Sequence, residues 1–179
     1  MKTEYELRVL EIDVDSIIKT LESLGATKVG DFFQKRYVYD LNPVQNGKWI
    51  RLRTNGIKTT LAYKDVVSNT IDGTKEVEIE VDNIENTNEL LNRLGYNPRS
   101  YQENKRIQYI LDDVEIDLDS WPMIPTYMEI EGRSEEEVNN MIEKLKIDKN
   151  KITALNCDDI YRDLYNIDIS TIKNLKFGE

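Results

Sequence analysis

The chain of 179 residues contains no histidine, one cysteine and no long apolar run. Without histidine, Ser-His-Asp and Cys-His catalysis and histidine-ligated zinc or iron are excluded. Because Cys157 is alone, it can form neither an intrachain disulfide nor a thiolate cluster. A bound metal would therefore take oxygen ligands, as Mg²⁺ and Mn²⁺ do. The N-terminus lacks a signal-peptide core and no segment reaches the roughly 20 apolar residues of a membrane helix, so we expect a cytoplasmic protein without a membrane partner.

Glycine and basic residues are also limited. The eight glycines form neither G-x-G-x-x-G nor G-x-x-x-x-G-K-[ST], so neither usual phosphate-binding loop is present. Lysine and arginine number 24 against 34 acidic residues, a net charge of −10. Such a surface repels phosphate backbones, so general nucleic-acid binding is not expected. The length predicts one domain over residues 1–179, with a core at about 3–132 and C-terminal helices within 134–179, and a homodimer is left open.

Apolar residues at helical spacing predict four helices. They cover residues 15–24, 88–94 and 134–145, with a last one beginning near Asp158. Gly25 and Gly95 suit the position after a helix end, and Ser134 with Glu137 forms a capping box. The rest of the chain alternates with period two, which is typical of strands. The predicted strands are 3–10, 28–40, 48–54, 58–65, 75–82, 100–111, 113–119 and 126–132.

These elements repeat once along the chain. The segment 4–9 (EYELRV) resembles 76–81 (EVEIEV), and each precedes a helix that ends in Leu-x-x-Leu-Gly. Lys35-Arg36-x-x-Tyr39 then matches Lys105-Arg106-x-x-Tyr109, and two more strand pairs follow in the same order. The repeat predicts two β-α-β-β-β halves related by a pseudo-twofold axis.

Each predicted strand carries charge on one face and apolar residues on the other. An antiparallel sheet with one solvated face would explain this for any single strand. Like charges, however, come in i, i+2 pairs: Arg51/Arg53, Glu78/Glu80, Asp117/Asp119 and Glu129/Glu131. Such neighbours repel unless a counter-ion lies between them, and the two halves place opposite signs at matching positions. We therefore favour a closed sheet that gathers these charges around one lumen.

A lumen with this lining suits a chain of phosphates. Arginine donates bidentate hydrogen bonds to phosphate, and carboxylate pairs hold Mg²⁺ that bridges phosphate oxygens. The candidate lining has five basic and eight acidic residues, which gives it a net charge of −3. The basic residues are Arg8, Arg51, Arg53, Lys64 and Arg106, and the acidic residues are Glu4, Glu6, Glu78, Glu80, Asp117, Asp119, Glu129 and Glu131. A polyphosphate of about −4 would be repelled by several kcal/mol, and two divalent cations would reverse the sign. Binding and turnover are therefore predicted to require a divalent metal.

The ordered set of motifs resembles the CYTH family, the triphosphate tunnel metalloenzymes. The family's Glu-x-Glu-x-Lys stands here as Glu4-Tyr-Glu6-Leu-Arg8, with Arg in place of Lys. The family's later motifs resemble Arg51-x-Arg53, Lys64, Glu78-x-Glu80, Asn104-Lys105-Arg106, Leu118-Asp119 and Glu129-x-Glu131. The resemblance covers residues 3 to about 132. It implies an α+β fold, an eight-stranded antiparallel β-barrel-like tunnel with helices packed outside.

The resemblance also implies roles for the charged residues. The principal metal, Mg²⁺ or Mn²⁺, would be bound by Glu4, Glu6, Glu129 and Glu131. Phosphates would be held by Arg8, Arg51, Arg53, Lys64 and Arg106. Four further acids would orient the basic side chains, bind a second metal or position the nucleophile: Glu78, Glu80, Asp117 and Asp119. Arg8 is counted with these residues as catalytic. Arg8 can replace lysine as a phosphate contact, but arginine does not lose a proton, so a base role for this position is disfavoured.

Three functions are compatible with these residues. The first is hydrolysis of a small-molecule triphosphate (inorganic, thiamine or nucleoside), in which water attacks the terminal phosphorus. The second is a class IV adenylyl cyclase, in which the ribose 3′-hydroxyl of ATP attacks the α-phosphorus. The third is a non-catalytic polyphosphate- or nucleotide-binding module. We favour hydrolysis, because it needs no nucleoside pocket. The aromatic residues Trp49 and Trp121 are interpreted as core or rim packing.

Overall fold

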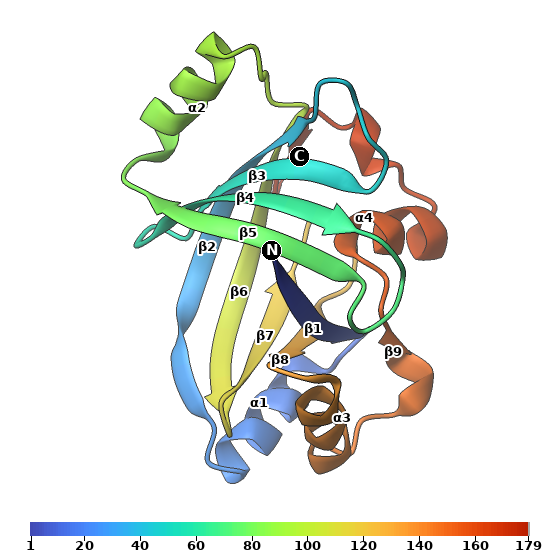
Figure 1. Cartoon of the computed structure of the whole chain (residues 1–179). Coiled ribbons are helices and arrows are strands. Elements are labelled where there is room, and N and C mark those ends of the chain that lie inside the picture. The colour runs from blue at the N-terminus through green and yellow to red at the C-terminus, as the bar shows by residue number, and fades with distance from the viewer. Residues whose placement is uncertain (179) are drawn as a thin grey trace.

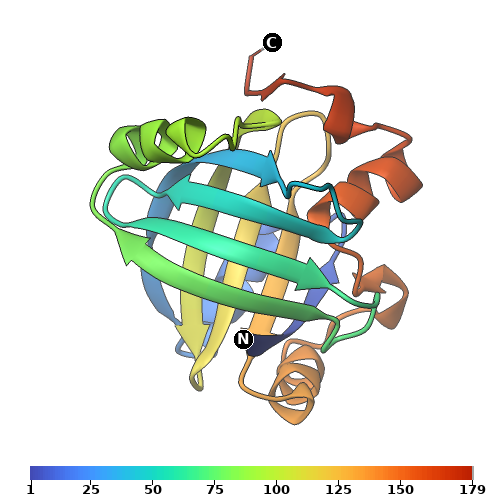
Figure 2. The ribbon, with the colours of Figure 1, turned by 45° about the horizontal axis from the view of Figure 1, so that its top comes forward.

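A computed structural model of the chain describes residues 1–178 (Figure 1). Within these residues the main strands are β1 (Lys2–Val9), β2 (Thr27–Asp40), β3 (Lys48–Thr54), β4 (Thr59–Val66), β5 (Thr74–Val81), β6 (Ser100–Leu111), β7 (Val114–Ser120) and β8 (Tyr127–Gly132). They follow the order β6-β2-β3-β4-β5-β1-β8-β7, and β7 pairs again with β6. All these pairings are antiparallel. Because β6 and β7 stand at the two ends of this order, their pairing closes the sheet into a barrel. In Figure 2, β3, β4 and β5 cross in front of the strands of the opposite wall.

The barrel predicted from the sequence is confirmed, as is its construction from two β-α-β-β-β halves. Strand boundaries agree with the predictions because period-two alternation is a local property of each strand. The second strand is continuous over Thr27–Asp40, and its pairing with β6 shifts register between Lys28 and Gly30. Two short strands, β9 (Ile152–Thr153) and β10 (Asn174–Leu175), extend the sheet beside β1 and β6.

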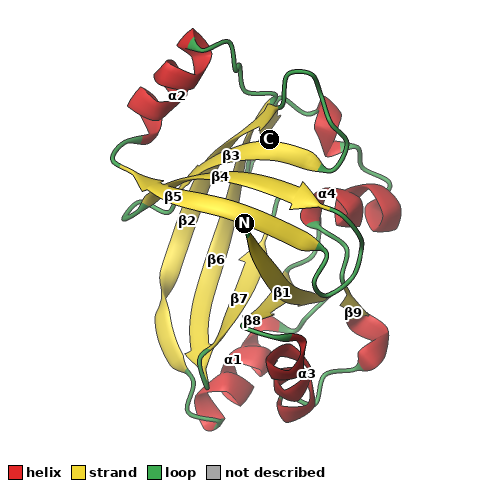
Figure 3. Cartoon of the chain, viewed as in Figure 1, coloured by secondary structure: helices red, strands yellow, loops and turns green. Residues whose placement is uncertain are grey.

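The helices lie outside the barrel (Figure 3). They are α1 (Val14–Ser23), α2 (Ile84–Arg93), α3 (Glu135–Lys144) and α4 (Cys157–Asp159), and α4 continues as a π-helical segment (Ile160–Leu164). The helix α2 begins before the predicted residue 88, because the polar residues 85–89 separate Ile84 from Leu90 and interrupt the apolar spacing. The Asn83 side chain caps this helix by accepting from the backbone N–H of Asn86. None of the helices in residues 1–178 is long and apolar enough to cross a membrane.

Most apolar side chains of the strands point outward, and helices cover many of them, whereas Val77 and Ile79 of β5 are exposed. The largest core joins α1 and α3 to the outer faces of β6, β7, β8 and β1, with Leu21, Ile116, Met128 and Val138 fully or almost fully buried. On the other side, Leu91 of α2 packs against Leu52 and Tyr39. Because the helices cover the outer faces of the strands, the charged faces are left to the inside of the barrel.

The segment after α3 packs over one end of the barrel. Its Ile160 and Tyr161 form a separate core with Trp121 and Tyr127, and the Tyr161 hydroxyl donates to the backbone carbonyl of Pro122 at 2.6 Å. Arg8, from the barrel wall, donates to the backbone carbonyl of Leu155 at 3.0 Å. These contacts fix residues 155–161 against the barrel end, where they add side chains to its interior.

Candidate active site

The charged faces of the strands line two adjoining hollows inside the barrel. Six side chains line both of them: Glu6, Arg51, Arg53, Lys64, Arg106 and Glu129. The wide hollow, of about 550 Å³, is the part that also includes Glu4, Glu76, Glu78 and Glu131. The narrow hollow, of about 90 Å³, is the part that also includes Arg8, Arg36, Trp121 and the C-terminal residues Asn156, Cys157 and Asp158. Glu6, Arg53 and Glu131, which come from three different strands, therefore line one enclosed space.

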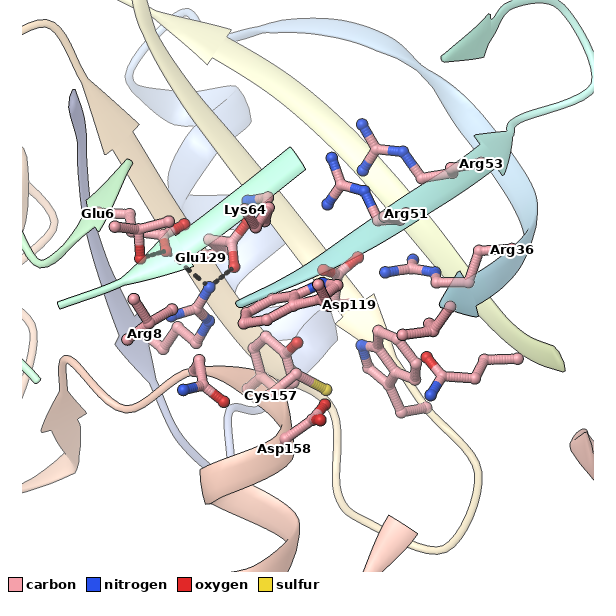
Figure 4. A pocket seen from close by; sticks show the side chains of 18 of the residues that line it. Glu6, Arg8, Arg36, Arg51, Arg53, Lys64, Asp119, Glu129, Cys157 and Asp158 are labelled. Carbon is pink, nitrogen blue, oxygen red and sulfur yellow. Dashed lines mark hydrogen bonds and ion pairs between the residues drawn. The ribbon is translucent and has the colours of Figure 1, made fainter. Parts of the chain in front are cut away.

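The two walls of the narrow hollow differ in charge. Figure 4 shows Glu6 and Glu129 on one side with Arg8 and Lys64, and Arg36, Arg51 and Arg53 on the other. The register explains the first group, because β1 pairs with β8 so that Arg8 lies opposite Glu129 and Glu6 opposite Glu131. Glu6 of β1 and Glu129 of β8 thus give the first side its negative charge, and the arginines of β2 and β3 give the second side its positive charge.

The four carboxylates predicted to bind metal lie on β1 and β8 but have different partners. Glu4 accepts from Lys64 at 2.8 Å, and Arg8 lies 3.1 Å from Glu6 and 2.6 Å from Glu129. Burial would raise the pKa of Glu129, but Arg8, Arg106 and Lys64 outweigh it and lower that pKa to about 2. Within residues 1–178, Glu131 has one basic partner, the exposed Lys2, at 3.3 Å. Burial together with Glu4, Glu129 and Glu6 raises the pKa of Glu131 to about 7.

This carboxylate cluster fits a divalent cation by its donor chemistry. The oxygens are those that Mg²⁺ and Mn²⁺ prefer, and the raised pKa of Glu131 reflects an excess of negative charge that a cation would relieve. In residues 1–178 no three acidic or thiol side chains already converge on one point suited to a metal ion. The carboxylates instead bind Arg8 and Lys64. A metal would therefore have to displace these bases from Glu4, Glu6 or Glu129.

The pKa of Glu131 predicts a pH-dependent stability. The folded chain binds the Glu131 proton more tightly than the unfolded chain, whose ordinary value is 4.5. The protonated Glu131 side chain therefore stabilises the folded chain fully below pH 4.5, and this contribution is lost as the pH rises through about 7. We expect the free energy of unfolding to fall by about 1–3 kcal/mol over this range, allowing for the partial exposure of the side chain. Denaturant unfolding at pH 5 and pH 7.5 measures the slope, and Glu131→Gln should reduce it; an unchanged slope in the variant would assign it to other groups.

Arg106 is held by the two aspartates of β7. Asp119 accepts from Nε at 2.8 Å and from an Nη at 2.5 Å, and Asp117 pairs with the other Nη. Glu129 lies 3.4 Å away on the open side. Asp117 is buried below the lining, and burial raises its pKa despite Arg106. This arrangement fixes the direction of a guanidinium that reaches both hollows.

Arg51 and Arg53 come from β3, and Lys64 comes from the neighbouring strand β4. Arg51 donates to Glu76 and Glu78 at 3.0 Å each, while Lys64 lies 3.6 Å from Glu76. Arg53 has one ion pair within residues 1–178, to Glu78 at 3.6 Å. Its pKa is lowered by burial and by the neighbouring arginines. These side chains keep donors directed at the shared space of the two hollows.

The carboxylates of β5 are divided between the interior and the outside. Glu78 lines the wide hollow, but Glu80 does not; its side chain is 67% exposed and pairs with Lys58 at 3.2 Å. Glu76, which the sequence motif did not select, lines the hollow and binds Arg51 and Lys64. β1 pairs with β5 only as far as Glu4 opposite Thr74 and Lys2 opposite Glu76, so Glu80 lies beyond the strand that would enclose it.

Sequence reasoning also missed Arg36 and the lining role of Trp121. Trp121 is packed in the C-terminal core, as interpreted, but it also lines the narrow hollow and lies 4.5 Å beneath the Arg36 guanidinium. The repeat could have identified Arg36, because it pairs Arg36 with Arg106. Trp49 likewise lines the narrow hollow.

The chain matches the CYTH domain family over residues 2–155, and it therefore belongs to that family. Among solved structures it is similar to the PH1012 protein of Pyrococcus horikoshii, with 23% identity, a TM-score of 0.73 and 86% of this chain and 96% of that chain covered. It is also similar to a candidate adenylate cyclase of Vibrio parahaemolyticus, with 13% identity, a TM-score of 0.75 and coverage of 93% and 99%.

A further similar structure is HpAC1 of Hippeastrum, a candidate adenylyl cyclase whose structure is described as revealing a dominant triphosphatase activity; it has 14% identity, a TM-score of 0.61 and coverage of 91% and 96%. No curated protein matches the chain. At these identities the solved structures support the fold, and the activity has to be argued from the barrel interior.

Proposed function

We propose that the chain is a divalent-metal-dependent hydrolase of small-molecule triphosphates. The observation that carries the proposal is that bases from several strands and a carboxylate cluster line one enclosed space. Enclosure matters because charges in a low-dielectric, water-poor space interact more strongly than on a surface. A phosphate chain bridged to the carboxylates by a cation would use both sets of charges. The family membership supports the same chemistry.

Each group in the interior has a proposed task. Glu4, Glu6, Glu129 and Glu131 would hold Mg²⁺ or Mn²⁺, which when bound offsets phosphate charge and makes water a stronger nucleophile at neutral pH. Arg51, Arg53, Lys64 and Arg106 donate to phosphoryl oxygens, and Asp117 and Asp119 keep Arg106 in place. Water attacks the terminal phosphorus, the bond from that phosphorus to the bridging oxygen breaks, and orthophosphate leaves together with the shortened phosphate chain.

Arg8 is closely bound in this arrangement. Its two Nη atoms contact Glu6, Glu129 and the Leu155 carbonyl, and its pKa is raised by Glu129 and Glu6 against the effect of burial. Arg8 would remain charged throughout, and it would release Glu129 when a cation replaces Arg8 as the partner of that carboxylate. We propose a role for Arg8 in phosphate contact, without proton transfer. Glu78 would orient Arg51 and Arg53, while the exposed Glu80 is not included in the proposed machinery.

The aromatic residues Trp49, Trp121 and Tyr127 line the narrow hollow of about 90 Å³, whereas the lining of the much larger wide hollow favours hydrolysis over cyclisation. Phe32 is its one aromatic side chain in residues 1–178, and the other lining residues are polar or charged. A cyclase must hold an adenine base, which usually needs an apolar or aromatic surface. A phosphate chain needs no such surface. The observation supports a substrate in which the phosphates supply most of the binding energy.

The assay that tests the proposal offers tripolyphosphate, thiamine triphosphate and ATP separately, with Mg²⁺ or Mn²⁺. We expect orthophosphate release from at least one of them, and loss of that release in excess chelator with recovery when metal is restored. Cyclic AMP and pyrophosphate from ATP would instead establish the cyclase. Binding without any product would establish the non-catalytic module, and turnover that continues in excess chelator would contradict metal dependence.

A further inference from the structure

Arg36 differs from the other bases of the interior in its lack of an acidic partner. Across residues 1–178 no carboxylate oxygen lies within 4.0 Å of its guanidinium, although the side chain is buried. Arg8, Arg51 and Arg106 each have at least two carboxylate partners. A buried charge without a counter-ion is costly, and an anionic ligand that pairs with Arg36 would offset that cost.

The contacts of Arg36 hold the guanidinium without neutralising it. One Nη donates to Gln34 Oε1 at 3.0 Å and to Asn104 Oδ1, and Nε has no hydrogen-bond partner among residues 1–178. Asn104 is fixed in turn by donating to Asp119 at 3.2 Å. The ring of Trp121 supports the flat face of the guanidinium at 4.5 Å. These neutral partners aim the cation, which points into the narrow hollow in Figure 4.

The surroundings of Arg36 add positive charge. Burial first, and then Arg51 and Arg106, lower the pKa of Arg36 to about 10, so it stays protonated at neutral pH. Arg53 is affected by Arg36 in the same way, and its single ion pair is long at 3.6 Å. Asp119 and Asp158 also face this end, but the six bases that line the narrow hollow outnumber its four acids, so the lining as a whole attracts an anion.

We propose that Arg36, together with Arg53, binds the phosphoryl group at the end of the phosphate chain farthest from Glu4 and Glu131. The lining supports this direction, because Arg36 lines only the narrow hollow, whereas Glu4 and Glu131 line only the wide one. Arg51, Arg53 and Arg106 line both and lie between. The inference rests on the proposed function for the identity of the ligand as a phosphate chain, and it adds a residue and a direction to it.

The test compares wild type with Arg36→Met, whose side chain can still pack on Trp121. The probe is imidotriphosphate, a triphosphate with P–N–P bridges that is not hydrolysed, in excess Mg²⁺. We expect its Kd to rise about 10- to 100-fold, as for loss of charge-assisted hydrogen bonds. We also expect the Tm of the ligand-free chain to stay the same or to rise by about 2–4 °C, because an unpaired buried charge is removed.

The matched control is Lys35→Met, which removes the same charge from the neighbouring residue, on the exposed face of β2. It should leave the Kd within threefold of wild type. A Kd within threefold of wild type for the Arg36→Met variant would overturn the inference. A fall of more than 4 °C in the ligand-free Tm of this variant would also overturn it, because Arg36 would then have a structural role. If this variant does not fold, Arg36→Gln, which keeps a hydrogen-bonding side chain beside Gln34 and Asn104, is judged by the same two measurements.

The inference and the proposed function can fail separately. If the wild type hydrolyses no triphosphate but binds imidotriphosphate in an Arg36-dependent way, the direction of the ligand holds and the hydrolase proposal fails. If the wild type hydrolyses triphosphate and Arg36→Met keeps a normal Kd and KM, the hydrolase proposal holds and the role of Arg36 is rejected.

Discussion

Glu6→Gln is expected to reduce kcat for triphosphate hydrolysis by on the order of 10³-fold, with the fold intact. Glu6 lines both hollows, and its carboxylate lies between Arg8 at 3.1 Å and the Thr74 hydroxyl at 3.4 Å. The amide keeps the shape of the side chain and one acceptor oxygen but loses the charge that a cation needs. Steady-state kinetics in saturating Mn²⁺, with circular dichroism to verify folding, measures the effect. Glu4→Gln should behave alike.

The matched control for Glu6→Gln is Glu136→Gln on α3, which makes the same change on the exposed exterior. It should leave kcat unchanged. A rate near that of wild type for both Glu6→Gln and Glu4→Gln would remove β1 from the metal site and leave the carboxylates of β8 without a partner strand.

Arg106→Met is expected to lower the free energy of unfolding by about 3–5 kcal/mol. The substitution leaves the carboxylates of Asp117 and Asp119, which are 3% and 1% exposed, without their shared cation. Taking one partner out of a buried ion pair costs more than the pair itself contributes, because the remaining charge is not hydrated. Denaturant unfolding at neutral pH measures the loss.

Arg133→Met provides the comparison for Arg106→Met, since Arg133 also pairs with two carboxylates but is 67% exposed. Surface ion pairs contribute little, so its cost should stay below about 1 kcal/mol. Equal costs for the two variants would mean that Arg106 is hydrated and that the interior is open to water. Adding Asp119→Asn to the Arg106→Met variant should recover part of the loss.

The barrel could be predicted from the sequence because its signals are local. Alternation of apolar and charged residues marks each strand and assigns each side chain to a face, and the i, i+2 pairs of like charge indicated that the charged faces meet. The closure itself depends on long-range pairings, of β1 with β8 and of β2 with β6, and was inferred from those charges and from the family resemblance. The location of the charged faces inside the barrel follows directly from closure.

The sequence was less informative where the end of a strand or a partner strand decides the environment. Glu76, Glu78 and Glu80 share one face of β5, and alternation alone cannot show that the wall next to Glu80 ends. The resemblance selected Glu78 and Glu80, whereas the structure encloses Glu76 and Glu78. Arg36 was overlooked although the repeat aligned it with Arg106, and its lack of a carboxylate partner depends on distant residues such as Asn104 and Trp121.

The most direct measurement is a crystal structure of the chain with Mn²⁺ and imidotriphosphate. We predict an anomalous manganese peak bound by carboxylate oxygens from both β1 and β8, with Glu4 or Glu6 and Glu129 or Glu131 among the ligands. The phosphoryl groups should lie along Arg51, Arg53 and Arg106, with the barrel unchanged. A ligand bound on the outer surface, or a barrel interior in which Glu4 and Glu129 keep Lys64 and Arg8 as partners at saturating metal and ligand, would contradict the account.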